Sequence, residues 1–287
     1  AWGVPYFFIR IAVRDFSPAT IIMARVLIGA AVLLPLAIKQ KALIPALKAW
    51  PWVLAFALIE MVGPWWLITN AEQHVSSGLA GLLVATVPFF GALIAYFYLG
   101  DKSIRHPKTL LGLLVGFIGV FLLVGIDSLQ GNTDPIWVWA VLLAAVLYAV
   151  APAVASVKLS HVSSTGTLPL SMLMVAAIYA PGAITNLPGE IAANPPVESW
   201  LSLAGLGVVC SAVAFLLFFA LMREIGSARS TLVTYMNTVV ALILGVSFLA
   251  EPITLGMMVG VPLVVVGSYF ATKRHAERNN FRLGAVE

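Results

Sequence analysis

The chain has 287 residues, of which 61% are hydrophobic and only 10% are charged. One soluble core of this size cannot bury so many apolar side chains, which excludes an ordinary soluble globular protein and indicates a membrane protein. The net charge of +4 does not indicate nucleic-acid binding, because the basic residues lie at the ends of apolar runs and not in a patch with aromatics. The single cysteine, Cys210, excludes a disulfide within the chain.

Apolar runs of about 20 residues recur along the chain, which is the length that a helix needs to cross about 30 Å of hydrocarbon. They lack the strict alternation of outer-membrane barrel strands, so we expect an all-α polytopic membrane protein. The first run has only about 13 residues before Arg14, too few to span, so we expect further residues upstream of Ala1 and no cleaved signal peptide. We expect the longest connection at 186–197, where three prolines lie. Charged residues, Pro and Gly bound ten expected transmembrane helices, at about 1–14, 17–38, 49–70, 75–99, 107–126, 135–158, 165–185, 198–222, 226–249 and 253–272.

Lys and Arg residues are concentrated in alternate connections of this predicted bundle. One side holds 13 of them and the other side holds Arg10 and Arg14, whereas Arg25 falls inside the second helix. Because basic residues are retained on the cytoplasmic side of a membrane, we predict that the 13-residue side is cytoplasmic. Both chain termini fall on that side.

The two halves of the chain repeat the same order of features. A shift of 150 residues places Ser77 on Ser227 and Asp101 on Glu251. Because each predicted half has five helices, the second half enters the membrane upside down, and such inverted repeats around a central cavity are typical of secondary transporters. The predicted units are a first repeat at 1–126, a second, inverted repeat at 135–272 and a basic cytoplasmic tail at 273–287.

Several segments of the chain resemble a known family. They are "WGVPYFFIR" (2–10), "SPATIIMARVLIGAAVLLPL" (17–36), "VPFFGALIAYFYLGD" (87–101), "GLLVGFIGVFLLVG" (112–125), "TVVALILGVSFLAEP" (238–252) and "GVPLVVVGSYF" (260–270). In this order they resemble the EamA-type members of the drug/metabolite transporter superfamily, which have ten helices in two repeats. The resemblance covers essentially the whole chain. It implies a multi-pass transporter in the inner membrane of a prokaryote that exports small metabolites, and the chain looks most like bacterial exporters of aromatic and other amino acids.

Two positions depart from the pattern of that family. Thr238 stands at the place equivalent to Pro88, whereas the family often has Pro at both, and Asp101 replaces the usual Glu. A proline inside a helix removes one backbone hydrogen bond and bends the helix. We therefore expect a gating hinge at Pro88, with Gly91 easing close packing, while the ninth helix stays straighter.

Two charged residues, Glu60 and Arg25, fall deep inside predicted membrane helices. A charge at this depth is costly unless it faces a wet cavity or a partner, so both are candidates for the substrate cavity. Glu60 either attracts a substrate ammonium group, or binds a proton that couples transport, or only locks helices together. Arg25, a position to which the family resemblance also points, either binds a substrate carboxylate or forms a structural contact with Glu60 or with a helix-end carbonyl.

Other candidates for the cavity lining are polar or aromatic. Trp65 and Trp66 are adjacent and point about 100° apart, so we expect only one of them to face the path. His74, which follows Glu72 and Gln73, is either a gate or a substrate contact on the outer side, or part of a solvated helix start. The uncharged polar residues of the second half suit an uncharged or zwitterionic ligand better than a phosphate. The full set of further candidates is Trp2, Pro5, Trp65, Trp66, Asn70, His74, Tyr148, Pro152, Ser211, Tyr235 and Asn237.

The sequence contains no HExxH, GxSxG or GxxxxGK[ST] motif, so we expect neither an enzyme nor ATP hydrolysis, and no metal or cofactor. The competing classes are an intramembrane enzyme and a structural scaffold. Among transporters, the alternatives are multidrug efflux and a nucleotide-sugar or sugar-phosphate carrier. A phosphate carrier needs several basic residues in its cavity, and only Arg25 lies deep enough.

The expected partners are a small-molecule substrate and the lipid bilayer, without nucleic acid. Small residues recur on the expected fifth and tenth helices, and such stripes permit close packing either between the repeats or in a homodimer.

Overall fold

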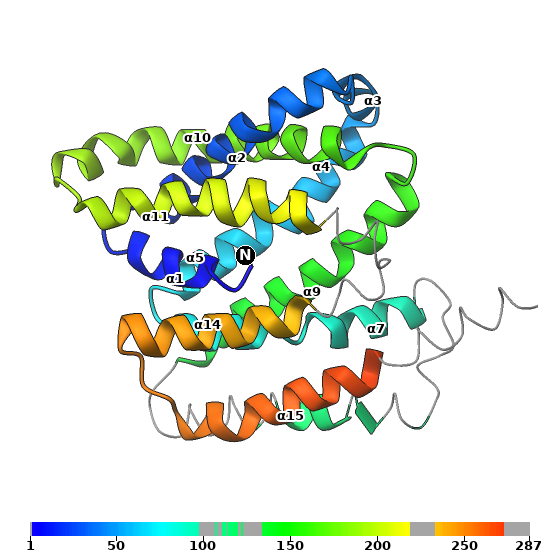
Figure 1. Cartoon of the computed structure of the whole chain (residues 1–287), viewed down its shortest axis with the longest axis vertical. Coiled ribbons are helices and arrows are strands. Elements are labelled where there is room, and N and C mark those ends of the chain that lie inside the picture. The colour runs from blue at the N-terminus through cyan, green and yellow to red at the C-terminus, as the bar shows by residue number, and fades with distance from the viewer. Residues whose placement is uncertain are drawn as a thin grey trace, which may run out of the picture.

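The computed structural model describes residues 2–97, 107, 111–112, 114–119, 122, 134–218 and 233–272. All regular secondary structure within these residues is helical. Figure 1 shows the helices side by side in a bundle that runs from α2 and α10 at one edge to α15 at the other. In chain order they are α1 (Pro5–Ala12), α2 (Pro18–Lys39), α3 (Leu43–Lys48), α4 (Trp50–Ala57), η1 (Leu58–Val62), α5 (Gly63–Ala71), α6 (Ser77–Val84), α7 (Val87–Phe97), α9 (Pro135–Lys158), α10 (Ser164–Ala192), α11 (Val197–Gly207), η3 (Val208–Val213), α14 (Val233–Leu249) and α15 (Leu255–Thr272).

Helix starts follow from capping residues in the sequence. Ser17 and Ser76 accept a backbone N–H of the first turn of α2 and α6, at 3.4 and 3.2 Å. Asp134 does the same for α9, at 3.0 Å. Each side chain satisfies one of the N–H groups that a helix start leaves without an intrahelical partner.

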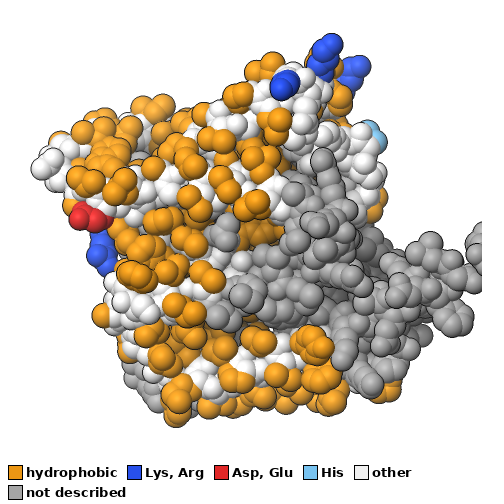
Figure 2. All heavy atoms as spheres, in the orientation of Figure 1, with side chains coloured by type: hydrophobic (Ala, Val, Ile, Leu, Met, Phe, Trp, Pro, Cys, Tyr) orange, Lys and Arg blue, Asp and Glu red, His pale blue; other side chains and the backbone are white. Residues whose placement is uncertain are grey.

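The helices have the length and the surface of membrane spans. Within the described residues, five helical stretches are long and apolar enough to cross a membrane, and three shorter apolar helices accompany them. Figure 2 shows hydrophobic side chains over most of the described face, with Lys and Arg side chains at its opposite ends. The fold is therefore that of an all-α polytopic membrane protein. The five long stretches are Pro18–Lys39, Trp50–Ala71, Pro135–Lys158, Ser164–Ala192 and Val197–Phe218.

Two expected boundaries differ from the structure. The connection expected from Asn186 is wrong over its first half, because α10 continues through Pro188 to Ala192. A proline removes one N–H donor, and the neighbouring turns of a membrane helix tolerate that loss. The fourth expected helix is divided into α6 and α7 by a turn at Ala85 and Thr86. The fifth expected helix falls largely outside the described residues, although 111–112 and 114–119 are helical.

Helices of the two halves of the chain pack against one another. α2 lies against α10 and α6 against α14, while α1 packs on α11 and α5 on α9. Close approach depends on small residues: a Cβ at Gly81 would lie 3.2 Å from the Tyr6 ring, and one at Gly119 would lie 2.8 Å from the Leu263 side chain. The two halves are thus interleaved, so that any cavity between them is lined by both.

Two glycines of α10 give a matched test of this packing. A Cβ at Gly166 would overlap the backbone carbonyl of Ala42, whereas nothing lies within 4 Å of one at Gly189. We expect Gly166→Ala to destabilise the detergent-solubilised protein by about 1–3 kcal/mol, because a backbone atom cannot be moved aside cheaply. Gly189→Ala should leave stability unchanged or raise it by about 0.5–1 kcal/mol through helix propensity. Thermal unfolding measures both, and equal melting temperatures for the two variants would contradict the described contact.

Candidate functional site

Two π-helical segments interrupt the helices that flank the centre of the bundle. The segment η1 lies between α4 and α5, and η3 follows α11. Their first residues, Leu58 and Val208, are 150 residues apart, the same spacing that relates the predicted repeats in the sequence. A π turn rotates the side chains that follow it and leaves a carbonyl without its usual partner, and such turns are frequent at functional sites. The first carries Glu60 and the second carries Ser211.

Arg25 is held between the two halves of the chain. Its side chain is buried, and its Nε donates to the Ser211 hydroxyl at 2.9 Å. The Ser211 hydroxyl in turn donates to the Leu206 carbonyl at 2.9 Å, which satisfies an acceptor near the end of α11, just before η3. The guanidinium carbon lies 3.7 Å from the centroid of the Trp65 ring, where a cation is attracted by the ring face. The Nη atoms of Arg25 have no hydrogen-bond partner within the described part of the chain.

Glu60 lies on the same cavity without pairing with Arg25. One carboxylate oxygen, Oε2, is buried and has no hydrogen-bond partner among the described residues. No ion pair joins Glu60 to Arg25, both of which the structure describes. Arg25 thus contacts Ser211 and Trp65 and, among the residues that the structure describes, neither of the structural partners that the sequence suggested, Glu60 or a helix-end carbonyl. Glu60 remains available to another group.

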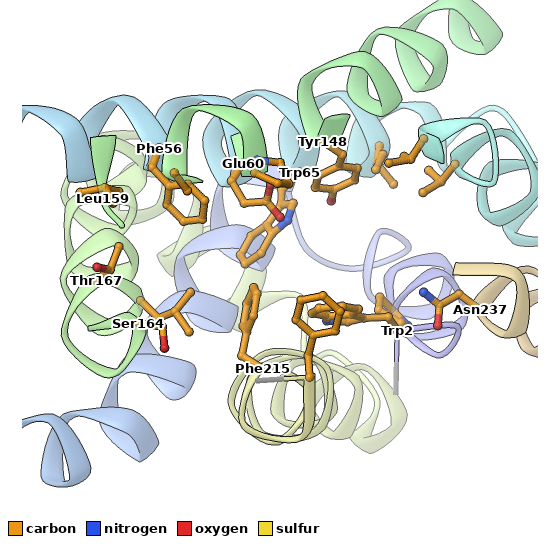
Figure 3. Close-up of a pocket in the computed structure, with 18 of the residues that line it drawn as sticks. Trp2, Phe56, Glu60, Trp65, Tyr148, Leu159, Ser164, Thr167, Phe215 and Asn237 are labelled. Atoms are coloured by element: carbon orange, nitrogen blue, oxygen red, sulfur yellow. The ribbon is translucent and has the colours of Figure 1, made fainter. Parts of the chain in front are cut away.

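The cavity between these residues has a volume of about 610 Å³. Figure 3 shows Glu60, Trp65 and Tyr148 on one wall, with Trp2 and Phe215 on the opposite wall. Most lining side chains are apolar or aromatic and a few are polar, the composition of a small-molecule site. The residues that line it are Trp2, Pro5, Tyr6, Ile9, Arg25, Phe56, Glu60, Trp65, Ile68, Val84, Val87, Tyr148, Pro152, Ala155, Ser156, Leu159, Ser160, Val162, Ser164, Thr167, Leu168, Phe215, Phe218 and Asn237.

The two ends of the cavity differ in exposure. At the connection between α9 and α10 it reaches Ser160, which is exposed. At the other end it is lined by Tyr6 and Ile9 of α1, which are both buried. Among the described residues the cavity thus extends to the surface on the side of the α9–α10 connection.

Most of the sequence candidates meet at this cavity. Those that line it are Trp2, Pro5, Arg25, Glu60, Trp65, Tyr148, Pro152 and Asn237, and Ser211 lies directly behind Arg25. Of the adjacent tryptophans, Trp65 faces the cavity and Trp66, which is 42% exposed, stacks on Tyr179.

Three other candidates need separate mention. Asn70 donates to the Trp66 carbonyl at 2.7 Å, and His74 stacks on Trp137 at 4.1 Å, so that neither lines the cavity. The side chain of Tyr235 lies outside the described residues.

The proposed hinge residues lie just after the break in the fourth expected helix. Pro88 occupies the first turn of α7, where a missing N–H leaves no helix carbonyl unsatisfied. The break itself is stabilised by Thr86, whose hydroxyl donates to the Leu83 carbonyl at 2.6 Å. A Cβ at Gly91 would meet nothing within 4 Å. The equivalent helix of the second half, α14, runs from Val233 to Leu249 without interruption.

The sequence model of the EamA-like transporter family matches residues 1–125 and 135–273 of this chain. The chain belongs to the EamA-like transporter family. A relative described as the uncharacterized inner membrane transporter YedA of Escherichia coli (strain K12) is 29% identical, over 93% of this chain and 88% of that protein. A second, described as the uncharacterized transporter YoaV of Bacillus subtilis (strain 168), is 25% identical over 96% and 94% of the two chains.

A solved crystal structure has the same fold. It superposes with a TM-score of 0.63 at 21% identity, over 95% of this chain and 94% of the other. Together with the family match and the apolar helices, this makes the protein a multi-pass membrane transporter.

Some lining residues of this EamA-family cavity escaped the sequence analysis. Phe56 and Phe215 are aromatic residues within apolar runs, where nothing in the sequence distinguishes a cavity wall from a lipid-facing surface. Ser164 and Thr167 were missed for another reason, because they begin a helix and have the ordinary composition of a helix start. The feature of the sequence that could have indicated their place is the short connection with polar residues between α9 and α10.

A double-mutant cycle tests the contacts of Arg25. We expect Arg25→Met and Ser211→Ala to be coupled by about 0.5–3 kcal/mol, because they are the two ends of one buried hydrogen bond. Arg25→Met and Glu60→Gln should instead be additive within about 0.5 kcal/mol, because these side chains form no ion pair. Thermal unfolding of the three single and two double variants, with the unaltered protein, measures both cycles. Strong coupling between Arg25 and Glu60 would contradict the described geometry.

Proposed function

We propose that this EamA-family transporter exports small amphipathic metabolites, amino acids including aromatic ones, by alternating access through the cavity. The observation that carries this proposal is the pair of opposite charges, Arg25 and Glu60, that line one aromatic cavity without neutralising each other. A zwitterion supplies both missing partners. No uncharged or singly charged ligand does so.

Arg25 is suited to receive the carboxylate of the substrate. Its Nε is already fixed by Ser211, and stacking on Trp65 restrains the plane of the guanidinium. The Nη groups therefore present donors in a defined direction, and arginine binds carboxylates through two such parallel hydrogen bonds. Little side-chain entropy remains to be lost when the ligand arrives.

Glu60 is suited to receive an ammonium group or a proton. Its unpartnered, buried Oε2 favours either ligand over a bare carboxylate ion. A proton and a substrate ammonium group cannot both neutralise Glu60 at the same time. Binding of one therefore displaces the other, which exchanges a proton for a substrate. We propose this competition as the coupling step.

The rest of the cavity supports a small amphipathic ligand. A volume of about 610 Å³ lies within the range of small-molecule sites. The rings of Trp65, Phe215 and Trp2 offer surface for an apolar or aromatic side chain, and Trp2 packs edge-on to Phe215 at 5.4 Å. The single deep arginine argues against a phosphorylated sugar or nucleotide, which needs several cations.

The direction of transport rests on the proposed inverted repeats. Two facts support them: the 150-residue spacing of η1 and η3, and the packing of α1 on α11 together with that of α5 on α9. With both termini in the cytoplasm, as the basic residues predict, the α9–α10 connection is cytoplasmic. The cavity then extends toward the cytoplasm, from which an exporter in a prokaryotic inner membrane takes its substrate.

Counterflow in proteoliposomes tests the substrate class. We expect the purified protein to exchange labelled amino acids, aromatic ones included, and not sugar phosphates or a cationic drug. Glu60→Gln should lower exchange about tenfold or more, because loss of one charged hydrogen bond costs about 1.5–3 kcal/mol. Glu198→Gln, which alters an exposed carboxylate at the start of α11, is the matched control and should exchange at the rate of the unaltered protein.

Two results would overturn parts of this proposal. Exchange of sugar phosphates but of no amino acid by folded protein would replace the substrate class. Unchanged exchange together with unchanged pH-driven flux in Glu60→Gln would make Glu60 a structural residue.

Pro88 and Gly91 are proposed as the hinge that gates the cavity. Val84 and Val87 flank the break before Pro88 and line the cavity, so a rotation of α7 changes the access to the site. We expect Pro88→Ala to slow transport severalfold while leaving substrate binding unchanged, because a restored N–H allows α6 and α7 to join into one stiffer helix. Measurement of the transport rate and of the equilibrium affinity for substrate in the same variant separates the two effects. Intact transport in Pro88→Ala would rule out the hinge.

A further inference from the structure

A second carboxylate, Glu72, is buried at the end of α5, away from the α9–α10 connection and outside the cavity lining. It is the C-cap residue of α5, and its backbone N–H bonds to the Ile68 carbonyl at 2.9 Å. Its side chain is 0% exposed, and neither carboxylate oxygen has a hydrogen-bond partner in the part of the chain that the structure describes. Its neighbours in sequence, Gln73 and His74, had favoured a solvated helix start, and the structure reverses that interpretation for Glu72.

The groups around Glu72 leave its carboxylate without compensation. From α1, Tyr6 interacts with it only through space, and Arg10 donates to its backbone carbonyl, not to its carboxylate. From α2, Arg25 acts only through space, because its own Nε bond goes to Ser211. On the side of α9, the nearby His74 is stacked flat on Trp137.

The other nearby charge, Glu251, makes an ionised Glu72 still more costly. Glu251 follows α14 and accepts three hydrogen bonds at the start of α6, from the Ser77 backbone N–H at 2.8 Å, the Ser77 hydroxyl at 3.0 Å and the Gly78 N–H at 3.0 Å. These donors lie at the start of α6, where the N–H groups of a helix have no intrahelical partner. They are consumed by Glu251, and its negative charge repels a second one on Glu72.

We propose that Glu72 is a proton-binding site that is occupied when this end of the transporter is closed and is emptied when it opens. A buried carboxylate ion without partners costs several kcal/mol, whereas the protonated acid costs far less. A metal cation is a poor alternative, because it needs several oxygen ligands and no group of three or more His, Cys, Asp or Glu residues among those described could hold one.

The coupling of this proton to transport rests on the function proposed above, whereas the protonation itself does not. In the proposed orientation, this end faces the outside of the cell. Opening it would bring Glu72 into water, and Arg10, which already touches the Glu72 backbone, is the cation that can neutralise the released carboxylate. The closed state then binds one more proton than the open state, so a rising external pH favours opening.

Infrared difference spectroscopy tests the protonation directly. We expect the reconstituted protein at neutral pH to show the carbonyl band of a protonated carboxylic acid, and Glu72→Gln to lose one component of that band. Glu198→Gln is the matched control and should lose nothing, because its carboxylate is exposed to solvent and not enclosed by the protein. If the Gln variant fails to fold, Glu72→Asp should shift the same component. An unaltered band in folded Glu72→Gln or Glu72→Asp would overturn the proposal.

A thiol-labelling experiment tests the link to opening. In a Cys210→Ser background, Ile9→Cys places a reporter at the buried end of the cavity, and Ala193→Cys in the exposed α10–α11 connection corrects for the pH dependence of the reagent itself. Labelling of Ile9→Cys by a membrane-impermeant reagent should rise severalfold with external pH, and Glu72→Gln should abolish that rise because glutamine mimics the protonated acid. A pH dependence unchanged by Glu72→Gln would overturn the coupling, even if counterflow of amino acids succeeds.

Discussion

The hydrogen bond between Arg25 and Ser211 joins the two halves of the chain at the point where each would otherwise bury an unpartnered polar group. A bilayer offers no water to such groups, so the protein must satisfy them itself. The Ser211 hydroxyl donates to the Leu206 carbonyl near the end of α11 and at the same time accepts the Arg25 N–H. The stacking of Arg25 on Trp65 extends this contact to the opposite wall, so one side chain fixes three helices around the cavity.

The chemistry of the cavity follows from what this contact leaves unsatisfied. Arg25 uses Nε for the structure and keeps its Nη donors for a ligand, while Glu60, on the π-helical segment η1, keeps an unpartnered oxygen. A buried pair of opposite charges would have neutralised itself and left an apolar cavity. Glu60 instead lies on η1, and Arg25 is hydrogen-bonded to Ser211 of η3, so the two charges stay apart and the aromatic cavity keeps a polar site. Glu72 adds a third group, which responds to access from the other end.

Much of this arrangement could be predicted from the sequence because a membrane simplifies the physics. The length of the apolar runs predicts the membrane helices. The free-energy cost of a charge deep in the membrane identifies Arg25 and Glu60 as candidates for the cavity. Because successive residues of a helix point about 100° apart, we predict that only one of Trp65 and Trp66 faces the cavity. The sequence does not indicate which one, because the π-helical segment η1 rotates the helix before them. The π-helical segments have no sequence signal of their own, since they depend on tertiary contacts such as the bond from the Tyr179 hydroxyl to the Val62 carbonyl. The burial of Glu72 could not be predicted, because the residues that follow it, Gln73 and His74, are polar and exposed and indicate a solvated segment.

Protection of introduced cysteines tests most directly whether the substrate occupies this cavity. In a Cys210→Ser background, Phe215→Cys places a thiol on the cavity wall, and Phe248→Cys places one on the outer surface, where the native side chain is 69% exposed. An amino acid that the protein exchanges should slow labelling of the first thiol and leave the second unchanged. Equal labelling of Phe215→Cys with and without a transported substrate would contradict the account, because the substrate would then follow another path.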